Sequence, residues 1–301
     1  MAPTPQYRWP LLEERAGGEV WLKHENHAPT GAFKIRGGLV YLQMLAEGEQ
    51  RVDGIVTATR GNHGQSIALA ARSTGVPVLV VVPHNNAADK NAAMRALGAE
   101  VVEFGGEFQD AAEEADRIAA SRGLHRIPTF HEKLVSGVAT YTLELLRAVP
   151  ALEALYVPIG QGSGFCGALA AKAALSHKAE VIGVVSTGAP AYARSLEAEK
   201  LVSCPVTTEL ADGMACRTPN ESALRLMRDA GIRIVEVSDE QIEDAIRLLF
   251  ATTHNIAEGA GAAATAALLA DENLKRKGPR AAVLSGQNID SGVAGRILSR
   301  Q

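Results

Sequence analysis

Short runs of apolar residues alternate with segments of helical periodicity along the whole chain. The apolar runs are rich in Val, Ile and Leu, which is typical of strands buried on both faces of a parallel sheet. They predict strands over residues 20–23, 54–59, 76–83, 100–104, 154–159, 180–185, 232–237 and 281–284. The segments between them predict helices over residues 62–73, 86–97, 110–121, 138–149, 164–176, 239–253 and 261–270. This alternation predicts an α/β fold of right-handed βαβ units with doubly wound sheets.

The composition is that of a globular protein with a substantial core, and it excludes several classes of function. The 301 residues are 47% hydrophobic and 21% charged, with a net charge of −4, so a nucleic-acid-binding surface is not expected. No apolar run approaches the roughly 18 residues of a membrane span, and the first residues lack the pattern of a signal peptide. Cys166, Cys204 and Cys216 show no C-x-x-C spacing. Reduced thiols in a cytoplasmic protein are therefore expected.

Two polar segments make local predictions. Ser238, followed three residues later by Gln241, predicts a helix N-terminus with a capping box. The charged stretch of residues 271–280 predicts an exposed loop. Neither segment indicates chemistry.

A glycine-rich segment lies between a predicted buried strand and a predicted helix. Residues 160–167 read Gly-Gln-Gly-Ser-Gly-Phe-Cys-Gly. Glycines let backbone N–H groups approach an anion, and a helix N-terminus adds partial positive charge. The segment predicts a phosphate site, and close packing of the strand against the helix is the alternative interpretation.

The spacing of Gly162, Gly164 and Gly167 also matches the G-x-G-x-x-G of dinucleotide-binding folds. That interpretation needs an acidic residue at the end of the next strand to bind a ribose, whereas the next predicted strand is followed by Ser-Thr-Gly. No Gly-Lys-Ser/Thr follows the glycines, which argues against a Walker A motif. A phosphate held by backbone and hydroxyl donors suits a small cofactor such as pyridoxal phosphate, which also needs an accessible lysine.

Lys34 is the candidate for that lysine. It lies between Phe33 and Ile35, at a turn that enters a helix. Apolar neighbours can desolvate an amine and make it a usable nucleophile. From these residues alone, a surface lysine with an exposed tip is the alternative.

Four ordered motifs carry a family resemblance. Residues 29–38, 59–65, 160–164 and 285–290 read Pro-Thr-Gly-Ala-Phe-Lys-Ile-Arg-Gly-Gly, Thr-Arg-Gly-Asn-His-Gly-Gln, Gly-Gln-Gly-Ser-Gly and Ser-Gly-Gln-Asn-Ile-Asp. Together they resemble the serine/threonine dehydratase and serine racemase family, the pyridoxal-phosphate (PLP) enzymes of fold type II. The resemblance implies a tryptophan synthase β-subunit-like fold of two doubly wound open sheets, with a small domain inserted in the large one. The large PLP-binding domain would comprise residues 1–52 plus 128–301, and the small mobile domain residues 53–127.

The same resemblance implies a role for each motif residue. Lys34 would bind pyridoxal 5'-phosphate as a Schiff base and remove the substrate α-proton. The cofactor-binding residues would be Phe33 beside the ring, Asn62 at the 3′-oxygen, Ser285 at the pyridine nitrogen, and Gly160, Gln161, Gly162, Ser163 and Gly164 at the phosphate. The substrate-binding residues would be Thr59, Arg60, Gly61 and His63. A serine hydroxyl does not keep the pyridine nitrogen protonated as a carboxylate would, which favours elimination of a β-hydroxyl over a long-lived carbanion.

The sequence departs from the family pattern at several positions. The racemases carry an acid/base serine where this chain has Arg60, and an arginine stays protonated at neutral pH, so racemisation by two bases is not expected. Arg60 would bind the α-carboxylate or a second carboxylate of the substrate, or else point to solvent. The family's two cation-binding carboxylates correspond to Val185 and Ala191, so no metal site is expected. His63 would either bind the substrate carboxylate or shape its loop.

The sequence thus predicts a cytoplasmic PLP-dependent dehydratase, or ammonia-lyase. It would convert a β-hydroxy-α-amino acid, threonine or serine, to a 2-oxo acid and ammonia by α,β-elimination. The alternatives are a 3-hydroxyaspartate-type dehydratase with Arg60 on the second carboxylate, an amino-acid racemase, and a non-catalytic amino-acid or phosphate-binding module. We expect a homodimer by analogy, with an amino-acid substrate and neither nucleic acid nor membrane as a partner. The sequence has no room for the appended regulatory domain of biosynthetic threonine deaminases, so feedback control through such a domain is not expected.

Overall fold

The chain divides into two compact units. The computed structural model describes residues 1–48, 52–271 and 278–300. The first unit combines Met1–Phe33 with Val138–Gln301, and the second unit is Lys34–Gly137. The predicted small domain, residues 53–127, lies inside the second unit, which begins earlier and ends later than that prediction.

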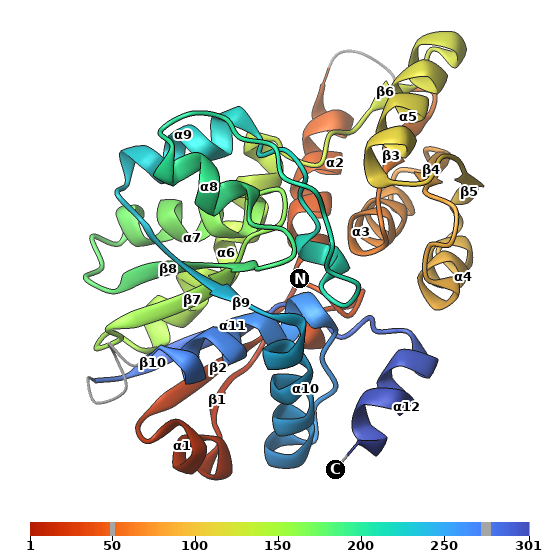
Figure 1. The fold of residues 1–301 in the computed structure, drawn as a ribbon. Coiled ribbons are helices and arrows are strands. Elements are labelled where there is room, and N and C mark those ends of the chain that lie inside the picture. The colour runs from red at the N-terminus through yellow and green to blue at the C-terminus, as the bar shows by residue number, and fades with distance from the viewer. Residues whose placement is uncertain (49–51, 272–277, 301) are drawn as a thin grey trace. The chain divides into compact units, whose positions relative to one another are not determined.

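A six-stranded sheet forms the centre of the first unit (Figure 1). Its order is β1-β2-β10-β7-β8-β9. The strands are β1 (Gln6–Arg8), β2 (Val20–His24), β7 (Ala154–Pro158), β8 (Glu180–Ser186), β9 (Arg233–Val237) and β10 (Arg280–Leu284). All neighbouring pairs are parallel except β1 with β2. Since β10 lies between β2 and β7, the C-terminal strand joins the N-terminal part of the chain to its middle.

Helices cover both faces of this sheet, with α10 and α11 on one side and α7 on the other (Figure 1). The helices of the first unit are α1 (Pro10–Ala16), α7 (Ser163–Ala174), α8 (Ala191–Glu197), α9 (Glu221–Asp229), α10 (Asp239–Thr253), α11 (Gly259–Ala270) and α12 (Ser291–Ser299), with the 3₁₀ turns η1 (Glu25–His27) and η2 (Asp212–Met214). Helix α6 (Glu132–Ala148) begins in the second unit and ends in the first. Residues 259–268 of α11 are all buried, and most are alanine or glycine. Such small side chains let α11 pack closely on the strands.

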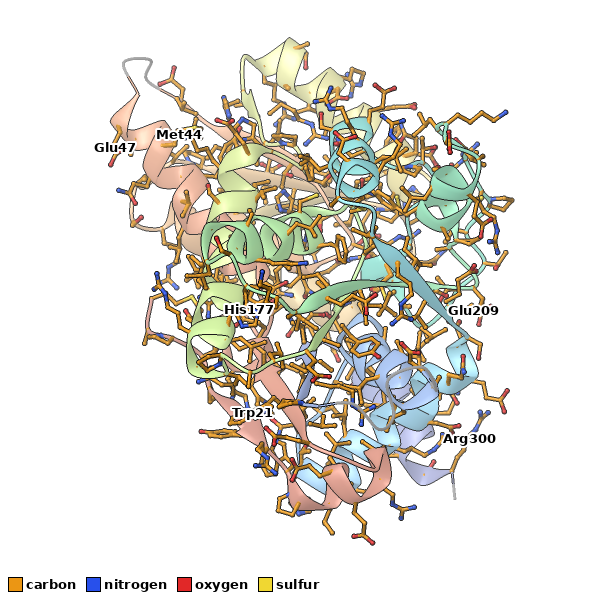
Figure 2. The ribbon with its side chains drawn as sticks, turned by 90° about the vertical axis from the view of Figure 1, so that its left-hand side faces the viewer. Trp21, Met44, Glu47, His177, Glu209 and Arg300 are labelled. Atoms are coloured by element: carbon orange, nitrogen blue, oxygen red, sulfur yellow. The ribbon has the colours of Figure 1, made fainter. Side chains whose placement is uncertain are left out.

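Polar contacts fix the ends of two helices in this unit. Ser238 Oγ accepts from the Gln241 backbone N–H at 3.2 Å, and Gln241 Oε1 accepts from the Ser238 N–H at 2.9 Å, which confirms the predicted capping box. Glu243 of α10 accepts from Arg296 at 2.7 Å and from Arg300 at 3.3 Å, so α10 is joined to the C-terminal α12. Figure 2 labels Arg300 beside these helices.

The second unit contains a four-stranded parallel sheet in the order β5-β4-β3-β6. Its elements are α2 (Lys34–Glu47), β3 (Ile55–Ala58), α3 (Asn62–Ala71), β4 (Val78–Val82), α4 (Ala88–Ala96), β5 (Glu100–Glu103), α5 (Phe108–Arg122) and β6 (His125–Arg126). The buried side chains of Val56 and Val81 pack against Ala111 and Ile118 of α5. This core holds the end of β3, and therefore the loop that follows it, in place.

Every strand and helix that the hydrophobic pattern predicted is present; the helix of residues 239–253 has the predicted bounds, and the others differ at one or both ends. One prediction about a loop is wrong in part. Residues 272–277 of the predicted exposed loop lie outside the described residues, but both of its ends are buried. Asp271 accepts from Tyr156 at 2.9 Å and pairs with Arg233 at 2.7 Å, and Arg280 Nη2 donates to the carbonyl of Ala16 at 2.9 Å. These partners come from distant strands and helices, which a local charge pattern cannot reveal.

None of the helices in the described part of the chain combines the length and the hydropathy that a membrane span requires.

Candidate active site

The predicted phosphate loop, residues 160–164, lies in the first unit between the end of β7 and the start of α7. Gly162 is the N-cap of α7 and has a φ of 96°, a conformation that favours glycine. No side chain of the described residues caps α7 at this end. The first N–H groups of the helix and its dipole are thereby left to an anion.

Neighbouring segments closely surround this loop. A Cβ at Gly160 would lie 2.3 Å from the carbonyl oxygen of Gly213, and a Cβ at Gly162 would lie 2.7 Å from the Cβ of Ala223. The Tyr192 hydroxyl donates to the carbonyl of Gln161 at 3.1 Å. It also accepts from the backbone N–H of Asn220 at 3.1 Å, so it joins the loop to the segment before α9. The loop is therefore held from outside by contacts that do not use its N–H groups.

Phe33 lies against the same loop. A Cβ at Gly164 would lie 3.3 Å from two carbons of the Phe33 ring. The Phe33 backbone N–H donates to the carbonyl of Ser285 at 3.0 Å. Tyr141 meets the Phe33 ring edge-on and donates to the carbonyl of Gly164 at 3.2 Å. The first unit thus brings together three groups predicted for the cofactor, namely Phe33, Ser285 and the glycine loop.

Ser285 follows directly after β10 and is buried. Its hydroxyl donates to the carbonyl of Ala260, at the start of α11, at 3.2 Å. The next residue, Gly286, has no room for a side chain, because a Cβ there would lie 2.3 Å from Oε1 of the buried Glu258. This buried carboxylate lies beside the Ser285 segment. In the sequence, residues 258–261 show only a weaker similarity to the family, which assigned Glu258 no role.

Lys34 is the first residue of α2 and of the second unit. Its carbonyl accepts from the Ser66 hydroxyl at 2.7 Å. A Cβ at Gly38 would lie 2.3 Å from Ser66 Oγ, so α2 and α3 are in close contact one turn beyond Lys34. The positive charge of Lys34 contributes, after burial, to the lowered pKa of His63 in the first turn of α3.

The predicted substrate loop, residues 59–63, follows the carboxyl end of β3. Thr59 Oγ1 accepts from the Gly61 N–H at 2.9 Å. Gly61 has a φ of 151°, and a Cβ there would lie 2.4 Å from Cδ of Lys90. Asn62 then begins α3. The structure therefore places a buried lysine from α4 against this loop, which sequence analysis missed because Lys90 lies in an ordinary polar helical pattern.

Three nitrogens in and after this loop are buried without a hydrogen-bond partner in the part of the chain that the structure describes. They are Arg60 Nε, His63 Nε2 and Gln65 Nε2. A buried donor left unpaired costs about 1–3 kcal/mol. Their concentration in one short segment indicates a place where a ligand supplies acceptor atoms.

His63 contributes to this segment as a neutral group. Burial lowers its pKa to about 3, and the positive charges of Lys34 and Arg126 act in the same direction. At neutral pH its imidazole is therefore uncharged and acts as a hydrogen-bonding group, not as a cation.

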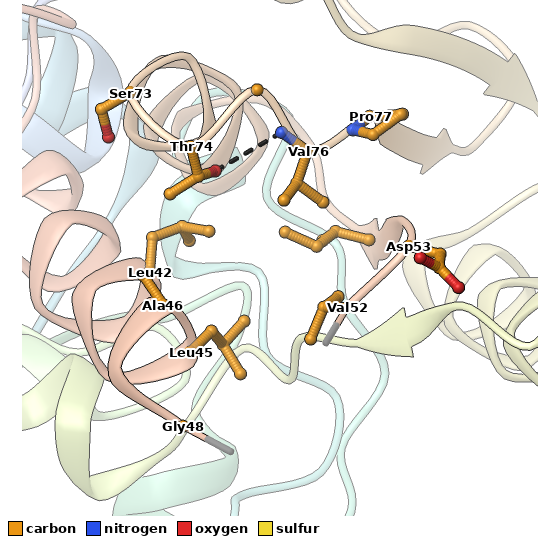
Figure 3. A pocket seen from close by; sticks show the side chains of 12 residues that line it. Leu42, Leu45, Ala46, Gly48, Val52, Asp53, Ser73, Thr74, Val76 and Pro77 are labelled. Carbon is orange, nitrogen blue, oxygen red and sulfur yellow. Dashed lines mark hydrogen bonds between the residues drawn. The ribbon is translucent and has the colours of Figure 1, made fainter. Parts of the chain in front are cut away.

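The second unit also contains a cavity of about 580 Å³ (Figure 3). Its wall includes Leu42, Leu45, Ile55 and Val76. Ile55 is the first residue of β3, whereas the substrate loop follows the other end of that strand. None of the predicted site residues lines this cavity.

No group of three His, Cys, Asp or Glu side chains placed to hold a metal ion occurs among the described residues. Val185 and Ala191, which stand where the family binds a cation, are buried. The absence of a metal site stays a prediction.

The residues present fit a pyridoxal-phosphate cofactor. The loop after β7 suits a phosphate, because Gly162 takes the left-handed conformation and no side chain of the described residues caps the N-terminus of α7. The Phe33 ring beside it offers a flat apolar surface for an aromatic ring. In the second unit, Lys34 offers an amine.

Comparisons with known proteins agree with this reading. Residues 1–286 match the family described as pyridoxal-phosphate dependent enzyme. The L-threonine ammonia-lyase of Thermotoga maritima is 36% identical over 292 residues, which cover 96% of this chain and 72% of that protein. Threonine deaminase isoform 2 of Solanum lycopersicum, in its processed form, has a TM-score of 0.91 at 28% identity over 99% of this chain and 88% of that one. Maize serine racemase has a TM-score of 0.89 at 28% identity over 97% of this chain and 90% of that one.

These matches confirm the predicted fold class and cofactor, and they confirm that the protein is an enzyme of the lyase type. The chain belongs to the family of pyridoxal-phosphate dependent enzymes.

Proposed function

We propose that the protein is a dehydratase, or ammonia-lyase, that converts a β-hydroxy-α-amino acid to a 2-oxo acid and ammonia. Threonine and serine are the substrates proposed, since the relative from Thermotoga maritima is an L-threonine ammonia-lyase. The observation that carries the proposal is the contact of Phe33 with both Ser285 and Gly164. This contact brings together residues from three of the four motifs in which the sequence resembles the dehydratases.

The first unit would hold the cofactor. The backbone N–H groups of residues 160–164 and the Ser163 hydroxyl would bind its phosphate, and Phe33 would pack beside its ring. Ser285 would face the pyridine nitrogen. A neutral hydroxyl would not keep that nitrogen protonated as a carboxylate would. The Ser285 O–H, which here donates to the carbonyl of Ala260, would donate to the nitrogen instead, which favours elimination over transamination.

Lys34 and Asn62 would act on the reacting end of the cofactor. When bound, pyridoxal phosphate withdraws electrons from the substrate α-carbon. The Lys34 amine would hold the aldehyde carbon at rest and, once displaced by the substrate amine, would take the α-proton. The Asn62 amide would donate to the 3′-oxygen. The C–O bond to the β-hydroxyl then breaks, water leaves, and hydrolysis releases ammonia and the 2-oxo acid.

The loop after β3 would bind the substrate. Thr59 and the N–H of Gly61 lie at the carboxyl end of a parallel strand, where ligands of such sheets bind. The unpaired Nε2 of His63 would bind a carboxylate oxygen without adding charge.

A substrate panel tests the proposed function. The purified protein is loaded with pyridoxal phosphate, and release of 2-oxo acid and of ammonia is measured for threonine, serine and their D-isomers. Lys34→Ala should lower release by at least about 1,000-fold, because base and nucleophile are lost together. The matched control is Lys200→Ala, an exposed lysine after α8, which should keep the parental rate. A Lys34→Ala variant as active as the parent would overturn the proposal, and interconversion of isomers faster than 2-oxo acid release would favour a racemase.

We also propose a cytoplasmic homodimer. The three cysteines are unpaired, which suits a reducing compartment. The dimer is proposed by analogy with the family, and sedimentation of the purified protein tests it.

A further inference from the structure

We propose that Arg60 binds a second carboxylate, so that the preferred substrate is a β-hydroxy-α-amino dicarboxylic acid of the 3-hydroxyaspartate type. The inference rests on the proposed function. Among the β-hydroxy-α-amino acids proposed there as substrates, it names the one that best fits the loop after β3.

Arg60 lies in a loop of fixed shape. It is the second residue beyond β3, which ends at Ala58. The residues on both sides of it are held, since Thr59 accepts from the Gly61 N–H and Lys90 packs against Gly61. A guanidinium carried on so restrained a backbone is already oriented for one ligand geometry, which reduces the entropy lost on binding.

The guanidinium of Arg60 pairs with no carboxylate among the described residues. Three other arginines of the second unit pair with carboxylates, namely Arg95 with Glu103, Arg117 with Glu114 and Arg126 with Asp116. Arg60 is half-buried, and its Nε is fully buried without a hydrogen-bond partner in the described ranges. An arginine offers Nε and one Nη as a flat pair of donors that matches the two oxygens of a carboxylate. A carboxylate would therefore supply the acceptor that Arg60 Nε lacks among the described residues.

The groups around the loop leave the charge of Arg60 for a second carboxylate. Helix α3 begins at Asn62 with its dipole positive toward the loop. His63 is neutral. One α-carboxylate would use the N-terminus of α3 and the His63 ring, since the Gly61 N–H already donates to Thr59. The methyl group of threonine or the hydrogen of serine would leave Arg60 Nε–H unpaired.

The chemistry is the same as for threonine, and the second carboxylate takes no part in it. The α-proton would pass to Lys34, and the C–O bond would break as the β-hydroxyl takes up a proton and leaves as water. The enamine so formed would tautomerise to an imine, and addition of water to that imine would release ammonia. The product is a four-carbon 2-oxo dicarboxylic acid, and no oxidant or reductant is required.

Turnover of two substrates tests the inference. The ratio of kcat/KM for threo-3-hydroxyaspartate to that for L-threonine is measured in the parent, in Arg60→Gln and in Arg60→Lys. The parent should favour the dicarboxylate by about tenfold or more, and Arg60→Gln should lose about 10- to 100-fold on the dicarboxylate but less than about threefold on threonine. Arg60→Lys, which keeps the charge but not the flat pair of donors, should fall between them. Arg72→Gln, an exposed arginine at the other end of α3, is the matched control and should leave the ratio unchanged.

A binding measurement gives a second readout that does not depend on turnover. L-aspartate and L-alanine lack the β-hydroxyl, and their dissociation constants are obtained from the change in cofactor absorption of the holoenzyme. The parent should bind aspartate at least about tenfold more tightly than alanine, and Arg60→Gln should remove this difference.

Three outcomes would overturn the inference while the proposed function stands. They are a parent that turns over threonine but not the dicarboxylate, equal losses on both substrates in Arg60→Gln, and equal binding of aspartate and alanine by the parent. Failure of every amino acid to release a 2-oxo acid would instead refute the proposed function, and the aspartate-to-alanine binding ratio would still decide the role of Arg60.

Discussion

The two loops that follow β7 and β3 both begin at the carboxyl end of a parallel strand. They differ in whether their buried polar groups find partners within the described chain. In the loop of residues 160–164, carbonyl groups accept from Tyr192 and Tyr141. The carbonyl oxygen of Gly213 and the methyl group of Ala223 leave no room for a side chain at Gly160 and Gly162. In the segment of residues 59–65, three side-chain nitrogens are buried without a partner in the described chain. Other segments of the protein hold the first loop in place, whereas in the second a ligand would supply the partners that these nitrogens lack in the described chain. A permanent cofactor suits the first arrangement and an exchanging substrate suits the second.

Adding one methyl group to the first loop should produce the largest effect. In Gly160→Ala the new Cβ would lie 2.3 Å from the carbonyl oxygen of Gly213, and neither partner is a flexible side chain. The loop must shift, so the affinity of the apoprotein for pyridoxal phosphate should fall by about 100-fold, as expected for an overpacked site. Titration of the apoprotein, followed by protein fluorescence, measures this without catalysis.

The matched control for this change is Gly295→Ala in α12. Nothing lies within 4 Å of a Cβ at this glycine. Alanine is the better helix former, so the substitution should raise the stability by up to about 1 kcal/mol and leave cofactor affinity unchanged. Parental affinity in Gly160→Ala would show that the loop after β7 does not bind the cofactor.

The glycine loop was predictable because its signal is local. A buried strand, a run of glycines and a helix start follow one another in the sequence, and the structure has β7 ending at Pro158 and α7 beginning at Ser163. The groups that hold the loop are not local. Tyr192 and Gly213 come from segments 31 and 53 residues beyond Gln161 and Gly160. No motif marks Tyr192, and Gly213 lies in a segment of only weak similarity to the family.

Removing one hydroxyl should weaken the first loop less. The Tyr192 hydroxyl bridges the carbonyl of Gln161 and the N–H of Asn220. Tyr192→Phe leaves both backbone groups unpaired in a buried place, at a cost of about 1–3 kcal/mol. We expect cofactor affinity to fall by about tenfold while the rate at saturating cofactor stays near that of the parent. A lower rate with unchanged affinity would mean that Tyr192 serves something other than the phosphate loop.

Lowering the pH should reduce the stability of the folded protein through His63, which follows β3. Burial lowers the pKa of His63 to about 3, whereas the ordinary value of 6.5 applies in the unfolded chain. As the pH falls below 6.5 the unfolded chain takes up a proton that the native His63 does not, so stability is lost between pH 6.5 and about 3. Between pH 7.5 and 6, His63 should account for about 1 kcal/mol of this loss.

Urea unfolding at the two pH values measures the effect. His63→Gln should retain about 1 kcal/mol more of its stability on going to pH 6 than the parent does. The control is His254→Asn, an exposed histidine in the left-handed conformation that asparagine tolerates. An equal loss in His63→Gln and in the parent would show that His63 already binds a proton in the native state. Burial that forces a histidine to stay neutral is a tertiary effect, so the motif alone left open whether His63 binds a ligand or shapes the loop.

The smallest effect should come from the side chain of Gln161. The family resemblance assigns this residue to the phosphate loop, where its side-chain amide is a candidate donor. Its Nε2 lies 3.7 Å from Sγ of the buried Cys216, a weak contact with a residue outside the loop. Gln161→Ala keeps the carbonyl that Tyr192 binds and the N–H groups of the loop, so cofactor affinity should change by less than about twofold. A tenfold loss would mean that the amide itself reaches the phosphate. In that case the loop after β7 would also depend on its ligand, and the contrast with the loop after β3 would be one of degree.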